Sequence, residues 1–215
     1  MLFTDRIEAG ERLAEVLVAR RYEHPVVLGI PRGGVVVAAE VARALGADLG
    51  VVVARKLRAP GQPELAIGAV AARGAAWVDA RLASLTGADD AYLEAEIERQ
   101  SEEAQRREER FDGSDKPHLL DRTVIIVDDG IATGSTAVAA IRAMKSAGAA
   151  EVVLAVPVAS PSAIERLSHE ADEIVCLVED PDFFAVGQFY VDFRQVDDDD
   201  VVYLLSALRR KPKAA

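Results

Sequence analysis

The sequence of 215 residues has little cysteine, little histidine and few aromatic residues, which make up 5% of the chain. Its one cysteine, Cys176, has no partner for an intramolecular disulfide, so a disulfide-stabilised scaffold is excluded. The three histidines, His24, His118 and His169, are scattered without the spacing of metal ligands. Because Cys176 stands in an apolar run, we interpret it as a small buried residue of a strand rather than a nucleophile.

Long apolar runs and an excess of basic charge are also missing. No run approaches the ~18–20 residues that span a bilayer, and the N-terminal residues lack the pattern of a secretory signal. We therefore expect a soluble, cytoplasmic protein without a membrane partner. The 25 Lys and Arg stand against 36 Asp and Glu, and the resulting net charge of −11 disfavours nucleic acid as a partner. Since 50% of the residues are hydrophobic, the chain is not mainly disordered.

What the sequence does contain is an alternation of short β-branched runs and helical patterns, which is typical of a parallel α/β sheet. The apolar runs predict strands buried on both faces, at Val26–Ile30, Leu49–Ala54, Val124–Val127, Val152–Val156 and Glu173–Val178. The helical patterns lie at Asp5–Arg21, Val35–Leu45, Ser135–Ala147, Pro161–Ser168 and Asp199–Leu208. A hairpin beside the main sheet is predicted from Ile67–Ala71 and Ala75–Val78.

One segment, Asp89–Arg110, is far more charged than the rest of the chain. Acids and bases recur in it four residues apart, as in Glu103 and Arg107, a spacing worth ~0.2–0.5 kcal/mol per pair on a helix. Its apolar stripe is thin. We therefore expect a surface helix with one narrow docked face, within an insertion over residues 79–116, and a dimer contact is the alternative.

The most specific chemistry lies in Val124–Thr136, where a buried strand ends in two adjacent acids, Asp128 and Asp129. A short loop, residues 133–136, follows and opens a helix. Ligands of open α/β sheets bind beyond the carboxyl ends of the strands, and a helix N-terminus with hydroxyls favours a phosphate. The acids are placed for sugar hydroxyls and a divalent cation. The segment is not a Walker phosphate-binding loop, because it lacks the lysine before the Ser or Thr. It is not a dinucleotide-binding fingerprint either, because it lacks the three glycines of that motif.

The run Val127-Asp-Asp-Gly-Ile-Ala-Thr-Gly-Ser-Thr136 resembles the phosphoribosyl pyrophosphate (PRPP) signature of type I phosphoribosyltransferases. The resemblance extends over most of the chain. It implies a single domain over residues 1–215 with an α/β fold, in which a parallel sheet is flanked by helices, and a small hood made of residues 180–195 and the N-terminal segment. The PRPP-binding residues that it implies are Arg32, Gly33, Lys56, Asp128, Asp129, Ala132, Thr133, Gly134, Ser135 and Thr136.

Two further segments resemble loops of that family. Gly29–Gly34 resembles the pyrophosphate loop, in which glycines let the backbone approach a ligand and Arg32 is a fixed cation. Ala54–Glu64 is a Pro/Gly-rich stretch unsuited to regular structure and resembles the mobile loop that closes over the site and brings Lys56 to the pyrophosphate. The resemblance thus gives Arg32 and Lys56 a catalytic role beside the two acids.

The aromatic residues gather in Pro181–Phe193, which resembles the hood of hypoxanthine-type phosphoribosyltransferases. By that resemblance Phe184 stacks on a ring acceptor and Val186 offers it backbone hydrogen bonds. Asp192 corresponds to an acid near the metal and the pyrophosphate. The implied metal ligands are therefore Asp128, Asp129 and Asp192. Ala132, however, stands where the hypoxanthine enzymes have an Asp that faces the purine, so the acceptor stays unnamed.

The resemblance implies a Mg²⁺-dependent enzyme that transfers 5-phosphoribosyl from PRPP to a nitrogen of a nucleobase-like ring acceptor and releases pyrophosphate. The alternative is a PRPP-binding regulatory or sensor protein with little or no turnover. A hydrolase is less favoured, because no nucleophile or water-activating histidine stands near the signature. Since members of the family are often dimers, the resemblance also implies a homodimer.

Overall fold

The computed structural model describes residues 2–112 and 116–209, so residues 113–115 of the predicted insertion lie outside the described residues. The main sheet has five strands in the order β2-β1-β6-β7-β8. They are β1 (Val26–Gly29), β2 (Asp48–Val51), β6 (Thr123–Val127), β7 (Glu151–Ala159) and β8 (Glu173–Glu179). Neighbouring strands are parallel throughout, which confirms the predicted fold class.

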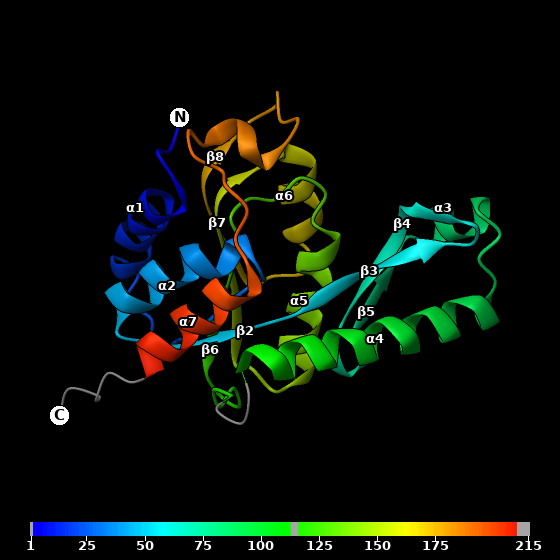
Figure 1. The fold of residues 1–215 in the computed structure, drawn as a ribbon, viewed down its shortest axis with the longest axis horizontal. Coiled ribbons are helices and arrows are strands. Elements are labelled where there is room, and N and C mark those ends of the chain that lie inside the picture. Colours follow the sequence, from blue (N-terminus) through cyan, green and yellow to red (C-terminus); the bar gives the residue numbers. More distant parts are fainter. Residues whose placement is uncertain (1, 113–115, 210–215) are drawn as a thin grey trace.

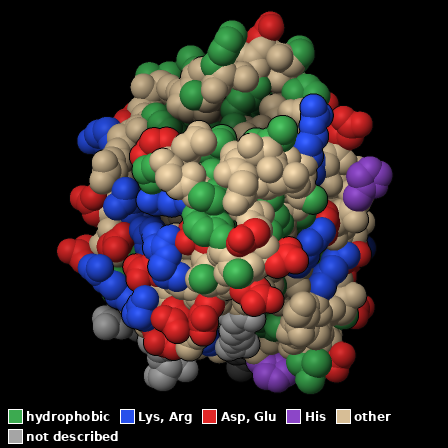
Figure 2. Space-filling model, turned by 90° about the vertical axis from the view of Figure 1, so that its right-hand side faces the viewer, with side chains coloured by type: hydrophobic (Ala, Val, Ile, Leu, Met, Phe, Trp, Pro, Cys, Tyr) green, Lys and Arg blue, Asp and Glu red, His purple; other side chains and the backbone are tan. Residues whose placement is uncertain are grey.

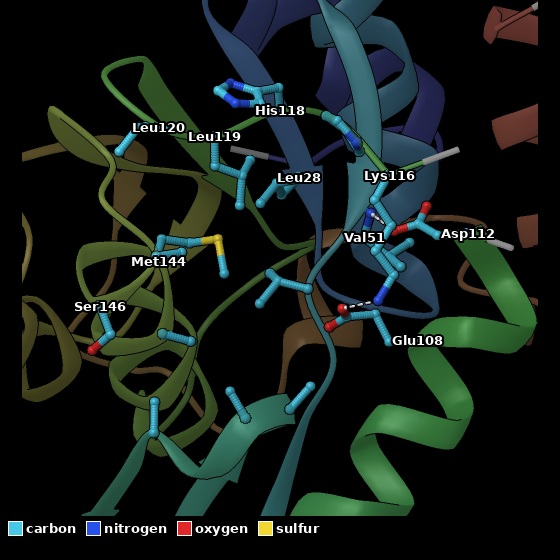
Figure 3. Close-up of a pocket in the computed structure, with 17 residues that line it drawn as sticks. Leu28, Val51, Glu108, Asp112, Lys116, His118, Leu119, Leu120, Met144 and Ser146 are labelled. Atoms are coloured by element: carbon cyan, nitrogen blue, oxygen red, sulfur yellow. Dashed lines mark hydrogen bonds and ion pairs between the residues drawn. The ribbon is translucent and has the colours of Figure 1, made fainter. Parts of the chain in front are cut away.

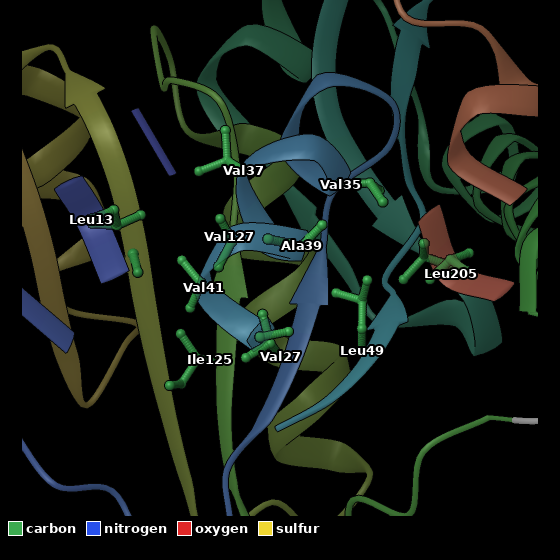
Figure 4. Close-up of a cluster of buried hydrophobic side chains, with 14 of the residues drawn as sticks. Leu13, Val27, Val35, Val37, Ala39, Val41, Leu49, Ile125, Val127 and Leu205 are labelled. Atoms are coloured by element: carbon green, nitrogen blue, oxygen red, sulfur yellow. The ribbon is translucent and has the colours of Figure 1, made fainter. Parts of the chain in front are cut away.

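Helices cover both faces of the main sheet (Figure 1), and an aliphatic cluster fills the space on each side. On one face pack α1 (Arg6–Val18), α2 (Gly33–Leu45) and α7 (Asp198–Arg209), whose Leu13, Val35 and Leu205 belong to one apolar cluster with Val27 and Val127 of the sheet (Figure 4). On the other face pack α5 (Ser135–Ser146) and α6 (Pro161–Leu167). Because both faces are covered, the central strands are apolar along their length, which is the pattern that made them recognisable in the sequence.

The predicted end of the strand Leu49–Ala54 is wrong, because the chain leaves the main sheet after Val51. It then forms a separate antiparallel sheet, in the order β3-β4-β5. Its strands are β3 (Ala54–Ala59), β4 (Gln62–Ala71) and β5 (Ala76–Val78), and the 3₁₀ turn Ala72–Gly74 joins the last two. The hairpin predicted from residues 67–71 and 75–78 is thereby confirmed.

The expectation that Ala54–Glu64 lacks regular structure is wrong. β3 pairs with β4 along its whole length, and Ala59 pairs with Gln62 across the turn Pro60-Gly61. Gly61 has a φ of 67°, which suits the third position of a turn that carries proline at the second. The register shifts on either side of Arg58 accommodate Pro63 in β4. Proline and glycine therefore mark a hairpin turn here rather than a loop.

The antiparallel sheet, α3 (Ala80–Leu85) and α4 (Asp90–Asp112) form an arm, residues 54–112, that extends to one side of the main sheet (Figure 1). The predicted helix of Asp89–Arg110 is confirmed, and Asp89 caps it by accepting a hydrogen bond of 2.8 Å from the Tyr92 amide. α3 was not predicted. The arm has a small apolar core of its own around Leu57 and Ile67.

α4 keeps part of the predicted charge pairing, since Arg106 contacts Glu102, four residues earlier, at 3.8 Å, but the predicted pair of Glu103 and Arg107 is wrong. Glu103 accepts from Arg106 at 3.1 Å, whereas Arg107 reaches α7 and contacts Asp198 at 3.1 Å. The face of the molecule in Figure 2 shows the same mixture, since basic side chains stand beside acidic ones over its lower half. Among residues 2–112 and 116–209, no helix is long and apolar enough to cross a membrane.

Candidate active site

Asp128 and Asp129 stand directly after β6, at the carboxyl edge of the sheet. The Asp129 amide donates a hydrogen bond of 2.9 Å to Asp128 Oδ1, which fixes the side chain of Asp128 against the backbone of its neighbour. Burial, together with the charge of Asp129, raises the pKa of Asp128 well above its ordinary value. Two carboxylates in one turn of chain thus form the acidic centre of the candidate site.

The predicted pyrophosphate loop packs directly on these acids. A Cβ atom added to Gly33 would lie 1.9 Å from Asp129 Oδ2, and one added to Gly34 would lie 2.8 Å from Asp128 Cα. No side chain larger than hydrogen fits at either position without moving the acids. The structure therefore brings the loop and the acids together, although they are far apart in the chain.

The loop after the acids begins α5. Gly134 is the N-cap of this helix and has a φ of 78°, a left-handed conformation that glycine adopts readily. The first amides of the helix have no intrahelical acceptor, so they can bind an anion. The hydroxyls of Thr133 and Ser135 lie 3.3 Å apart at this end, and Ser160 fixes the loop by donating to the Ala132 carbonyl at 2.6 Å. Ala132 and Thr133 are exposed, while Thr136 is half-buried.

Arg6, at the start of α1, is a residue of this site that the sequence analysis missed. Its Nε donates to Asp129 Oδ2 at 2.7 Å, and the two side chains are only 11% and 15% exposed. Its guanidinium carbon also lies 3.9 Å from the ring centre of Phe193, and its Nη1 donates to the Arg194 carbonyl at 2.9 Å. The two ion-pair partners are 123 residues apart, so no local pattern in the sequence could pair them.

The hood segment lies over the signature. Phe3 joins it by two backbone hydrogen bonds of 2.8 Å, with the Phe189 carbonyl and the Val191 amide. The Tyr190 hydroxyl donates to the Asp129 carbonyl at 2.6 Å. The structure differs at the two residues predicted to bind the acceptor. Val186 is half-buried, because its side chain packs over Gly130.

Phe184, the other predicted acceptor residue, is 90% exposed. Its backbone amide is nevertheless held, since it donates to Gln188 Oε1 at 2.8 Å. A large apolar ring fixed by its backbone and open to solvent is available to stack on a flat molecule.

Asp192, the third predicted metal ligand, makes its side-chain contacts with Arg194. It pairs with Arg194 at 2.7 Å, and the hydrogen bonds from Arg194 lower its pKa. Asp192, Arg194 and Arg6 line one pocket of about 400 Å³. Within the described part of the chain, no three acids, histidines or cysteines form a cluster that could hold a metal ion. Asp128 and Asp129 alone still fit Mg²⁺, which takes one or two carboxylates and completes its shell with water and substrate oxygens.

The two basic residues predicted to contact the pyrophosphate, Arg32 and Lys56, lie in different surroundings. Arg32, the residue before α2, is half-buried, and its Nη1 lies 3.8 Å from Asp198 Oδ1 at the start of α7. Arg107 and Arg110 of α4 contact the same carboxylate. Lys56 stands exposed on β3 opposite Ala69, and no hydrogen bond or ion pair between described residues joins it to the acids.

A pocket of about 460 Å³ lies elsewhere, between α5, β2 and the end of α4 (Figure 3). Its walls include Leu28, Val51 and Met144, and its polar rim carries the ion pair of Lys116 and Glu108 at 2.8 Å. None of the predicted site residues lines it. The candidate active site therefore lies apart from this pocket, at the carboxyl edge of the sheet where the predicted loops meet.

The chain is similar in sequence and in fold to known proteins. The family model of the phosphoribosyl transferase domain matches residues 4–194. A Mycobacterium tuberculosis H37Rv protein, provisionally named a phosphoribosyl transferase, is 47% identical over 210 residues, which are 97% of this chain and 47% of that protein. The chain thus spans about half the length of the curated relatives it matches.

Two solved structures show the same fold. The protein TT1426 from Thermus thermophilus is 48% identical, covers 97% of this chain and 99% of its own, and superposes with a TM-score of 0.83. A hypothetical protein from Neisseria gonorrhoeae is 12% identical, covers 96% of each chain and has a TM-score of 0.52. On the match over residues 4–194, the chain belongs to the phosphoribosyl transferase domain family.

Proposed function

We propose that the protein transfers 5-phosphoribosyl from PRPP to a nitrogen of a nucleobase-like ring acceptor and releases pyrophosphate. One observation carries the proposal: Gly33 and Gly34 pack directly on Asp129 and Asp128, at the edge of the sheet where α5 begins. A glycine loop, two acids and a helix N-terminus are the parts needed for the pyrophosphate, the ribose and the 5′-phosphate of one ligand.

Each part of PRPP would meet a different group. The amides and hydroxyls of residues 133–136 would bind the 5′-phosphate at the start of α5. Asp128 and Asp129 would accept hydrogen bonds from the 2′- and 3′-hydroxyls of the ribose. The backbone of Gly33 and the guanidinium of Arg32 would face the pyrophosphate. Binding energy from the phosphates, remote from the reacting carbon, then orients that carbon.

The reaction breaks the bond between the ribose C1 and a pyrophosphate oxygen, whose electron pair leaves with the pyrophosphate. The lone pair of the acceptor nitrogen forms the new bond to C1, and the nitrogen releases its proton to solvent. The ribose carries positive charge in the transition state, and the carboxylates of Asp128 and Asp129 would stabilise it electrostatically. Arg32 would stabilise the negative charge of the leaving group.

We propose Mg²⁺ as the cofactor, held by Asp128 and Asp129 together with ligand oxygens, and with Asp192 as a further acid at the pyrophosphate side. When bound, the ion would neutralise pyrophosphate oxygens as bond breaking proceeds. Lys56, whose side chain is solvent-exposed on β3, would supply a further cation to the pyrophosphate. Phe184 would stack on the acceptor ring, and its exposure of 90% supports this role.

The test is an incubation of the protein with PRPP, Mg²⁺ and a mixed pool of purines, pyrimidines and other ring acceptors. Mass spectrometry of the products, together with an assay of released pyrophosphate, identifies any new ribonucleotide. We expect one acceptor to gain a 5-phosphoribosyl group. A tight PRPP complex without turnover on any acceptor would contradict the transferase and support the sensor protein.

A further inference from the structure

Arg6 is held from three sides at the point where the N-terminal segment, the hood and the acids meet. Its Nε binds Asp129 Oδ2 at 2.7 Å, its Nη1 donates to the Arg194 carbonyl at 2.9 Å, and its guanidinium lies over the Phe193 ring at 3.9 Å. At 11% exposure the side chain has little freedom. A guanidinium with planar, fixed donors suits such a role better than a flexible ammonium group would.

The ion pair with Arg6 occupies only one of the two carboxylate oxygens of Asp129. Oδ2 is taken by Arg6 and lies against Gly33, where even a Cβ atom would approach to 1.9 Å. The backbone of Asp129 is fixed as well, because its carbonyl accepts from Tyr190 at 2.6 Å and its amide donates to Asp128. A carboxylate fixed at one oxygen and at both backbone groups presents its remaining oxygen, Oδ1, in one orientation.

We propose that Arg6 is a positioning residue of the PRPP site: it fixes Asp129 so that Oδ1 faces the ribose, and it ties the hood to the acids. The inference rests on the proposed function and deepens it, because it gives the N-terminal helix a part in ligand binding. Binding of PRPP then depends on a charge in α1, and the position of the acceptor hood depends on the same side chain.

The experiment compares Arg6→Gln and Arg6→Lys with the matched control Arg12→Gln. Arg12 lies on the same helix, also forms an ion pair, with Glu8, and also lies over an aromatic ring, that of Phe3 at 5.6 Å. Its ion pair is with Glu8 rather than with the acids of the site. PRPP affinity is measured by isothermal titration with Mg²⁺, thermal stability by calorimetry, and mobility of residues 128–130 and 189–193 by hydrogen exchange.

We expect Arg6→Gln to weaken PRPP binding roughly tenfold, the loss typical of one hydrogen bond to a charged group. Amide exchange in both segments should rise. Arg6→Lys should recover part of the affinity, because it keeps the charge, and Arg12→Gln should bind PRPP like the wild type. A role in packing alone would make the Gln and Lys variants equal in affinity.

Three results would overturn the inference. Wild-type affinity in Arg6→Gln would show that Asp129 needs no partner, and the proposed function would stand. Tighter binding in Arg6→Gln would show that Arg6 blocks Asp129 instead of orienting it. Failure of the wild type itself to bind PRPP would remove the proposed function together with the inference, so the two failures are distinguishable.

Discussion

The main sheet and the arm hold their parts of the candidate site by different forces. Asp128 and Asp129 follow β6, whose Val124 to Val127 are completely buried among aliphatic side chains on both faces. Lys56 instead stands on β3, to which α4 docks through two buried polar side chains, Glu96 and Gln100, 4% and 2% exposed.

Two residues close to Lys56 in the sequence, Arg55 and Arg58, donate hydrogen bonds to side chains of α4. Gln100 Oε1 accepts from Arg55 Nε at 2.8 Å, and Glu96 Oε1 accepts from the Arg58 amide at 3.1 Å. Glu96 also accepts from Gln100 at 3.0 Å and from Arg99. The strand that carries the acids is thus held by apolar packing, which pH hardly changes, whereas α4 docks on the arm's sheet partly through hydrogen bonds to one carboxylate, which protonation can remove.

The largest effect on stability should come from a cavity in the main sheet. Leu154 of β7 is completely buried, and Leu154→Ala should lower the free energy of unfolding by about 3 kcal/mol, through lost apolar contact and an unfilled cavity. Urea denaturation measures the change. Leu85→Ala in the arm is the control, since Leu85 is 73% exposed and should change stability by less than about 0.5 kcal/mol. Equal effects of the two variants would show that apolar packing in the main sheet contributes no more to stability than an exposed side chain of the arm.

A smaller effect is expected where the arm docks. Glu96→Gln keeps the shape of the side chain but removes the charge that strengthens its hydrogen bonds, so unfolding should cost about 1–2 kcal/mol less. Amides of β3 should exchange faster with solvent, while those of β6 should not. Glu98→Gln is the matched control, because Glu98 is exposed on the same helix. If β6 loosened as much as β3, the arm would not be a separately held region.

The pH dependence of the arm follows from the same carboxylate. Burial alone would raise the pKa of Glu96, but hydrogen bonds from Arg99, the Arg58 amide and Gln100 outweigh it and lower the pKa below its ordinary value of 4.5. The ionised form therefore stabilises the fold above that value, and the contribution is lost as pH falls through the lower, folded pKa. The difference in unfolding free energy between wild type and Glu96→Gln should shrink on acidification. A difference that stays constant down to about pH 3 would contradict this.

The smallest effect on stability belongs to the hood. Phe184 buries almost nothing at 90% exposure, so Phe184→Ala should change the unfolding free energy by less than about 0.5 kcal/mol. If the ring stacks on the acceptor, the variant should raise the KM for the acceptor about tenfold and leave PRPP affinity unchanged. Steady-state kinetics with the acceptor found in the pool experiment measures both. A loss of PRPP affinity instead would place Phe184 at the sugar.

The sequence predicted the main sheet well, because strands buried on both faces are short, continuous apolar runs rich in β-branched residues. Val26–Ile30 and Val124–Val127 are confirmed as β1 and β6 within one residue. The arm was predicted less well. Its Pro60-Gly61 turn was interpreted as part of a loop, since proline and glycine occur in both and only the pairing partner decides between them.

The residues of the candidate site also differ in how well the sequence predicted them. The acids and the loop after them are neighbours in the chain, so a local motif was enough to propose them. Arg6 and Asp198 reach the site from the first and last helices, and their contacts with Asp129 and Arg32 exist only in the folded protein. The assignment of Lys56 and Asp192 to the site stays a prediction.

The central claim is that Asp128 and Asp129 hold PRPP. The measurement that tests it most directly is isothermal titration with PRPP and Mg²⁺ on the wild type and on the Asp128→Asn/Asp129→Asn double variant. Both substitutions keep the shape of the side chains, and calorimetry checks that the variant is folded. We predict that the wild type binds and that the variant loses at least about a hundredfold in affinity, roughly 2.7 kcal/mol. Equal affinity of the two proteins would contradict the account.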